Sequence, residues 1–232
     1  MTPMDHVRLA IMLDDSAALG QAISDGADVR VADCNGVTAL HAAASFGRVQ
    51  CVRVLIDAGV NVDAATDDYT TPLHLAALNG TEPCVQVLLR AGADLDLRDV
   101  NGRSAAHHAA WEGHLECLRA LLDHGPAERA HDMDRFTPAK FAAASGHTDC
   151  FLLLLDRGSG IDELDRNDWV AAWRQATPDE AARLLRYTAE PLLNDIRRSL
   201  RRMKPLPRSV AVLDAMSARR PAPARLSGLL RP

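Results

Sequence analysis

One pattern of residues occurs four times along this 232-residue chain, at an interval of 33 residues. His41, His74 and His107 follow one another at that interval, and Lys140 takes the same position in a fourth copy. Two further series keep the same phase: Gly47, Gly80, Gly113 and Gly146, and Leu55, Leu88, Leu121 and Leu154. A fixed period of this length is typical of an array of small units, each packed only on its neighbours. The period therefore predicts a solenoid and not a fold wound around one central core.

The second copy indicates that each unit is a pair of helices. Thr71 is a good N-cap, and Pro72 suits the first position of a helix. Gly80 ends this short helix, and Gly92 ends the next one as a left-handed cap. Between the two glycines, apolar residues recur at helical spacing, as expected for a buried stripe: Val85, Leu88 and Leu89.

The motif Thr-Pro-Leu-His at 71–74, with an alanine pair after it and Gly-Ala-Asp at 92–94, resembles the ankyrin repeat. The resemblance covers roughly residues 5–187. It implies an all-α ankyrin-repeat solenoid of helix-turn-helix units with short β-hairpin loops, about four full repeats and degenerate caps.

The repeat phase divides the chain into units. We expect an ankyrin repeat domain over residues 1–187, a basic amphipathic helical segment at 188–216 and a disordered tail at 217–232. Within the domain we expect an N-terminal cap at 4–32, full repeats at 33–65, 66–98, 99–131 and 132–164, and a degenerate C-terminal unit at 165–187. The outer face of the N-terminal cap should be polar, as capping requires, through Asp5, Arg8, Asp14, Asp15 and Gln21.

The repeats carry no catalytic constellation, so we expect no enzymatic activity and no cofactor. The histidines at the repeat period are interpreted as structural. His107, His108 and His114 could suggest a metal site, but no carboxylate or cysteine follows at ligand spacing, so we expect no metal. No glycine-rich phosphate-binding loop of the usual patterns is present.

Cysteines and hydropathy bear on the compartment. Four of the five cysteines are 33 residues apart and are interpreted as small buried hydrophobes: Cys51, Cys84, Cys117 and Cys150. The absence of a Cys-x-x-Cys pair favours reduced thiols, hence a cytoplasmic or nuclear location. No apolar run approaches the length of about 18 residues that a membrane span needs. We expect a monomer.

The resemblance implies a protein partner bound on the concave face, which is lined by hairpin tips and the ends of the first helices. Transferred by position, the partner-binding residues are Asn35, Val37, Phe46, Asp67, Asp68, Thr70, Leu78, Asn79, Asn101, Arg103, Trp111, Glu112, Met133 and Phe136. Phe46, Leu78 and Trp111 are large and apolar where stacking does not require it, so they are the expected binding anchors.

The segment 188–216 allows three interpretations. Its apolar stripe could close the stack as a cap, or its arginines could bind acidic lipid or nucleic acid, although we do not expect a nucleic-acid partner. It also looks like a suppressor-of-cytokine-signalling (SOCS) box, which implies elongin and cullin as partners, through Leu192, Ile196, Leu200, Leu206 and Pro207. The sequence departs from that box, because the usual Cys and closing Tyr-Leu are absent and the spacer before Leu206 is short.

Overall fold

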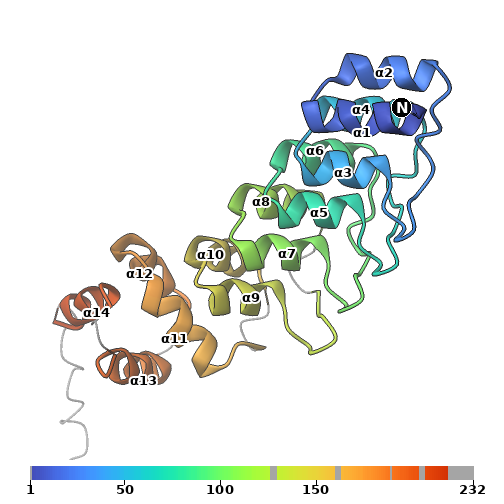
Figure 1. Cartoon of the computed structure of the whole chain (residues 1–232). Helices are drawn as coiled ribbons and strands as arrows, with labels where there is room; N and C mark the ends of the chain where they lie inside the picture. The colour runs from blue at the N-terminus through green and yellow to red at the C-terminus, as the bar shows by residue number, and fades with distance from the viewer. Residues whose placement is uncertain (1, 126–129, 160–162, 189, 204–206, 219–232) are drawn as a thin grey trace, which may run out of the picture.

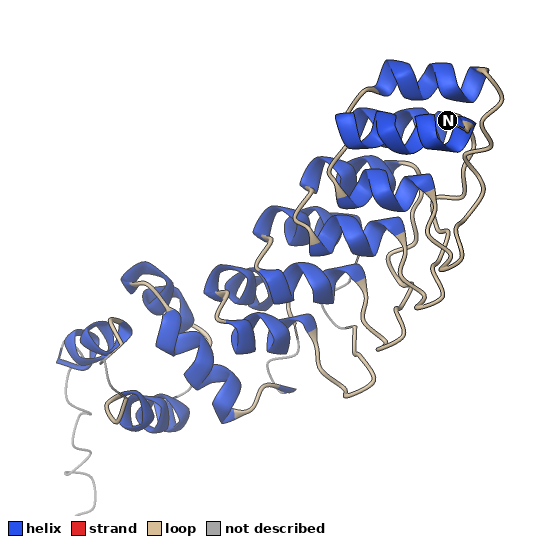
Figure 2. Cartoon of the chain, viewed as in Figure 1, coloured by secondary structure: helices blue, strands red, loops and turns tan. Residues whose placement is uncertain are grey.

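The computed structural model describes residues 2–125, 130–159, 163–188, 190–203 and 207–218. These residues form 14 α-helices and, within the described ranges, no β-strand (Figure 2). The helices follow one another in pairs: α1 (Pro3–Leu13) and α2 (Ser16–Ser24), α3 (Ala39–Ser45) and α4 (Val49–Asp57), α5 (Pro72–Leu78) and α6 (Glu82–Arg90), α7 (Ala105–Glu112) and α8 (Leu115–His124), α9 (Pro138–Ser145) and α10 (Thr148–Asp156), α11 (Arg166–Gln175) and α12 (Pro178–Leu184), α13 (Glu190–Leu200) and α14 (Ser209–Ala218).

The pairs stack into two layers (Figure 1). Each odd-numbered helix packs on the next odd-numbered one, from α1 through to α13, and each even-numbered helix packs on the next even-numbered one. These contacts join neighbouring units, which is the arrangement that the 33-residue period predicts. The expected all-α solenoid is confirmed.

Small residues set the distance between the odd-numbered helices. Each of α3, α5, α7 and α9 contains a fully buried alanine pair, beginning with Ala43 and Ala44. The even-numbered helices supply the larger side chains, and the leucine series is completely buried at Leu55, Leu88, Leu121 and Leu154. Burial of one such leucine contributes about 1.5–3 kcal/mol, which no isolated unit could obtain.

The loops that precede α3, α5, α7 and α9, here called fingers, are at residues 33–37, 66–70, 99–103 and 132–136. Each finger is a turn and contains no strand, so the fingers are less regular than the short β-hairpins that we expected. Asp33 N–H donates to the Val37 carbonyl at 2.9 Å, and the later fingers repeat this bond. Neighbouring fingers are joined by one backbone bond each, such as Asp67 N–H to the Asn35 carbonyl at 3.0 Å. A loop of five residues is too short to continue the ladder into a strand.

The C-terminal segment continues the stack. α13 packs on α11, and α14 packs on α12 and α11. Leu193, Ile196 and Leu200 of α13 are buried, which accounts for the apolar stripe seen in the sequence. We expected a disordered tail at 217–232, but residues 217 and 218 end the helix α14, and residues 219–232 lie outside the described residues.

The opposite end of the stack is less polar than the capping rule predicts. The polar residues expected on α1 and α2 are present, but three apolar side chains are also exposed there: Leu9, Met12 and Leu13. A groove of about 450 Å³ runs between the two helices, and its lining includes Leu9, Leu13, Asp15 and Asp25. The first unit therefore only partly shields the end of the core.

Candidate protein-binding face

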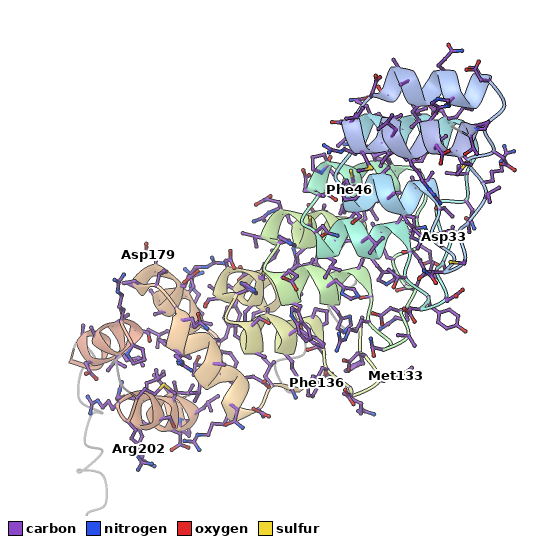
Figure 3. The ribbon with its side chains drawn as sticks, in the orientation of Figure 1. Asp33, Phe46, Met133, Phe136, Asp179 and Arg202 are labelled. Carbon is purple, nitrogen blue, oxygen red and sulfur yellow. The ribbon has the colours of Figure 1, made fainter. Side chains whose placement is uncertain are left out.

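The fingers and the adjoining surface of α3, α5, α7 and α9 form one continuous side of the solenoid, here called the finger face. All 14 predicted partner-binding residues lie on it, and none is fully buried. Val37, Thr70, Leu78 and Arg103 are half-buried, and the other ten are exposed. Met133 and Phe136 lie on a finger, whereas Phe46 is at the far end of α3 (Figure 3). Of the three predicted anchors, Phe46 and Trp111 are 57% and 42% exposed, so stacking leaves much of each ring accessible, whereas Leu78 is half-buried.

A series of side-chain acceptors keeps the fingers in shape. Asp33 Oδ1 accepts the N–H groups of Asn35 and Val37, both at 2.9 Å. Asp99 and Asp132 repeat this arrangement, and Thr66 replaces aspartate in the second finger. The bond from Asn35 N–H contributes most to lowering the pKa of Asp33 below its ordinary value. The carboxylates therefore fix the finger geometry and are only partly available to a ligand.

The histidines at the repeat period connect one unit to the next. The Nδ1 of His74 accepts the Thr71 N–H at 3.1 Å and lies 2.8 Å from the Thr71 hydroxyl. Its Nε2 lies 3.0–3.1 Å from a carbonyl oxygen of the next finger, as do those of His41 and His107. This geometry requires a neutral ring with its proton on Nε2. Burial lowers the pKa of His74 and of His107 to about 4.

A second series joins the loops at the other end of α3, α5 and α7. The Arg48 guanidinium donates to the Met12 carbonyl at 3.1 Å, and the Thr81 hydroxyl donates to the Ala44 carbonyl at 3.0 Å. His114 Nε2 lies 3.0 Å from the Leu78 carbonyl in the same relation. His114 is thus hydrogen-bonded to the backbone of the preceding repeat, which gives it a structural role. The sequence signal for this role is the 33-residue interval itself, which places Arg48, Thr81 and His114 at one repeat position.

Between the third and fourth repeats the finger face carries a cluster of aromatic and cationic side chains. The Trp111 and Phe141 ring centroids are 5.0 Å apart, and those of Phe136 and Phe141 are 6.0 Å apart. The Arg103 guanidinium carbon lies 4.8 Å from the Trp111 centroid and 5.1 Å from that of Phe141. Lys140 Nζ lies 4.9 Å from the Phe136 centroid.

Sequence reasoning missed two contributors to this face. Phe141 was not expected there because its equivalents, Ala42, Leu75 and His108, are not among the residues expected on this face. Tyr69 is exposed on the second finger, where it replaces the glycine found at Gly36. The signal that could have identified both is the deviation of one repeat from the others, at an exposed position for Tyr69 and at a buried one for Phe141.

In the described part of the chain, potential metal ligands are dispersed and most of the thiols are buried. There, no three His, Cys, Asp or Glu residues are grouped so that they could hold a metal ion. Cys34 is exposed and the other four cysteines are buried. Burial raises the pKa of Cys84 to about 11 and of Cys150 to about 12, which keeps these thiols protonated. No helix within the described ranges has the length and apolar character of a membrane span.

The described residues of the possible docking box are buried or half-buried against the rest of the solenoid. Ile196 and Leu200 are fully buried, and Leu192 and Pro207 are half-buried. Leu206 lies outside the described residues. An elongin-type partner could reach Ile196 only if α13 left its place against α11.

Two-layered helix pairs with projecting fingers define a repeat protein of the protein-binding class. The family model for ankyrin repeats in three copies matches residues 8–99 and 83–167, which together cover more than half of the chain. The chain therefore belongs to the ankyrin-repeat family. No curated protein matches it.

Proposed function

We propose that this chain is a non-enzymatic scaffold or adaptor that binds a segment of a protein partner on its finger face. Ankyrin repeats are a protein–protein interaction module, which supports the general class. The observation that supports the location is that all four repeats expose large apolar side chains there, four on the fingers and two at the far ends of α3 and α7: Tyr69, Val100, Met133 and Phe136, and Phe46 and Trp111. Exposed apolar groups with polar groups around them are typical of interaction surfaces.

A peptide selection tests this proposal even though the partner is unidentified. The full chain is immobilised, and binders are selected from a displayed random-peptide library and then titrated as synthetic peptides. Phe46→Ala and Trp111→Ala should each weaken binding at least tenfold, while Leu13→Ala, at the exposed N-terminal end, should leave it unchanged. The proposal is wrong if no peptide is enriched, or if the binders are indifferent to both anchors. Thermal melting must show that the variants stay folded, and unfolding of Trp111→Ala would place that ring in the core.

Substrate recognition for an elongin–cullin–RING ubiquitin ligase is the alternative function. It rests on the pattern of Leu192, Ile196 and Leu200 followed by Leu206-Pro207. The burial of Ile196 and Leu200 favours the cap interpretation instead. Purified elongin heterodimer mixed with the full chain tests the alternative, which predicts a complex that is lost in Leu192→Asp.

We also propose that the chain acts as a monomer in the cytoplasm or nucleus. All five cysteines are free in the structure, in keeping with a reducing compartment. Sedimentation across a range of concentrations tests the monomer, and imaging of a tagged chain tests the location.

A further inference from the structure

At one place on the finger face, several residues differ from their equivalents in the other repeats and lie together. Arg103 takes the position of Val37 and Thr70, and Trp111 takes that of Ser45 and Leu78. Phe141 of the next unit replaces the alanine, leucine or histidine found at its position elsewhere. The other units stack without these side chains. Their combination at a single junction therefore needs an explanation other than the repeat fold.

The two rings hold the Arg103 guanidinium in a fixed place. Its central carbon lies within about 5 Å of both ring centroids, at 4.8 Å from Trp111 and 5.1 Å from Phe141. A stacked guanidinium keeps its N–H groups free at the edge of its plane, where they can bind a carboxylate with two parallel bonds. Because the side chain is already ordered, less conformational entropy is lost when a ligand binds.

The neighbouring carboxylate of Asp132 forms a loose ion pair with this guanidinium but no hydrogen bond. Arg103 Nε lies 3.9 Å from Asp132 Oδ2, which is beyond hydrogen-bonding distance. The other oxygen of Asp132 accepts the N–H groups of Asp134 and Phe136. Within the described ranges, Nε of Arg103 is buried with no hydrogen-bond partner. Because Nε is buried, a carboxylate brought from outside would bind the two terminal nitrogens of the guanidinium.

Apolar surface adjoins the guanidinium. The indole of Trp111 is 42% exposed, Phe136 43% and Met133 74%. Glu112 and Asp134 are also exposed in the same region, and they repel a partner with a run of acidic residues. The surface thus suits one carboxylate next to one large apolar side chain.

We propose that the junction of the third and fourth repeats binds a protein segment in which a single Asp or Glu lies next to a large apolar residue. The carboxylate pairs with the guanidinium of Arg103, and the apolar side chain packs beside Trp111 and Phe136. This inference rests on the proposed function, since it specifies the kind of segment that the finger face recognises.

Peptides selected on the immobilised chain provide the test. We expect the strongest binders to contain one acidic residue beside an aromatic or aliphatic one. Replacing that acidic residue by its amide should weaken binding at least tenfold, as should Arg103→Gln. Combining the two changes should cost little more than either alone, because each removes the same pair. Arg53→Gln, which removes an exposed cation on α4, is the matched control and should change nothing.

Other outcomes separate this inference from the proposed function. Arg103→Lys keeps the charge but not the planar fork, so affinity within twofold of the wild type would overturn the stacked, bidentate contact. Peptides that need Phe46 and Trp111 but bind Arg103→Gln equally well would leave the proposed function standing and refute the inference. A selection that yields no binder would refute both.

Discussion

His107 and Phe136 are 29 residues apart in the sequence, yet Nε2 of His107 lies 3.0 Å from the carbonyl oxygen of Phe136. The same relation joins His41 to Thr70 and His74 to Arg103. Each histidine therefore links the start of one odd-numbered helix (α3, α5 or α7) to the finger of the next repeat. Its ring can do so only when neutral, because Nδ1 must accept a backbone N–H while Nε2 donates.

This requirement predicts that the fold weakens in mild acid. Burial depresses the pKa of His74 and His107 from the ordinary 6.5 to about 4, so the unfolded chain binds protons more readily. The stabilisation is complete above pH 6.5 and is lost as the pH falls toward 4. The loss for each histidine is roughly 3 kcal/mol. Urea unfolding at a series of pH values measures it.

Two substitutions give this prediction its controls. His107→Gln should lower stability at neutral pH and make the remaining dependence on pH shallower. His6→Gln, which changes an exposed histidine, should alter neither. A free energy of unfolding that stays constant from pH 7 to pH 4.5 would contradict the assigned role of the histidines.

The fingers give a second prediction, because the same backbone conformation is adopted by different residues. Gly102 has φ of 75°, and Arg135, one repeat later, has φ of 62°. A side chain costs about 1–2 kcal/mol in this left-handed region. Replacing Arg135 by glycine removes this cost, but the greater conformational freedom of glycine in the unfolded chain offsets part of the stabilisation. Arg135→Gly should therefore raise the free energy of unfolding by about 0.5–1 kcal/mol.

The reverse change at Gly102 should be harmful for two reasons. Alanine is unfavourable at the positive φ of this residue. Its Cβ would also lie 2.9 Å from the backbone nitrogen of Met133 on the next finger. Gly102→Ala should therefore destabilise the fold, by more than Arg135→Gly stabilises it. Denaturant melts of both variants decide the matter, and equal stability of the three proteins would contradict the strain argument.

Most of the repeat architecture follows from the sequence, because a fixed interval determines which residues are equivalent. Once Thr71 is identified as the N-cap of α5, Ser104, 33 residues later, is identified as the N-cap of α7. The 33-residue interval does not predict contacts between side chains of different repeats, nor the packing of segments outside the repeats. Phe141 occupies a helix position by pattern, but its contacts with Arg103 and Trp111 depend on side-chain directions. The 33-residue phase is lost beyond residue 187, so the sequence left open whether α13 packs on α11.

Burial separates the cysteines, which gives a third prediction. Cys34 is exposed on the first finger, whereas Cys117 and Cys150 are buried and their thiols have pKa values of about 12 because of that burial. Only the thiolate reacts quickly with thiol reagents. One cysteine should therefore be labelled in the native protein and all five after denaturation. Cys34→Ser should abolish the native labelling, and rapid labelling of Cys84 or Cys150 without denaturant would contradict the core assignment.

The last helix pair gives the fourth prediction, which concerns what closes the stack. Trp169 and Trp173 are buried in α11, on which α13 and α14 pack. Ser209 of α14 donates its hydroxyl to the Trp173 carbonyl, and Trp173 Nε1 lies 3.4 Å from the Thr188 hydroxyl. The burial of Leu193, Ile196 and Leu200 contributes about 1.5–3 kcal/mol for each side chain as an upper estimate.

Truncation after Thr188 should therefore expose the apolar side of α11 to water. We expect the melting temperature to fall by at least about 5 °C and tryptophan emission to shift to longer wavelength. Truncation after Ala218 removes only residues 219–232 and is the matched control. Its melting temperature should equal that of the full chain. If α13 were instead a docking helix that leaves the stack, the chain truncated after Thr188 would also melt with the full chain. Equal melting of all three proteins would thus refute the cap, because the free energy that buries Ile196 and Leu200 must be lost when they are removed.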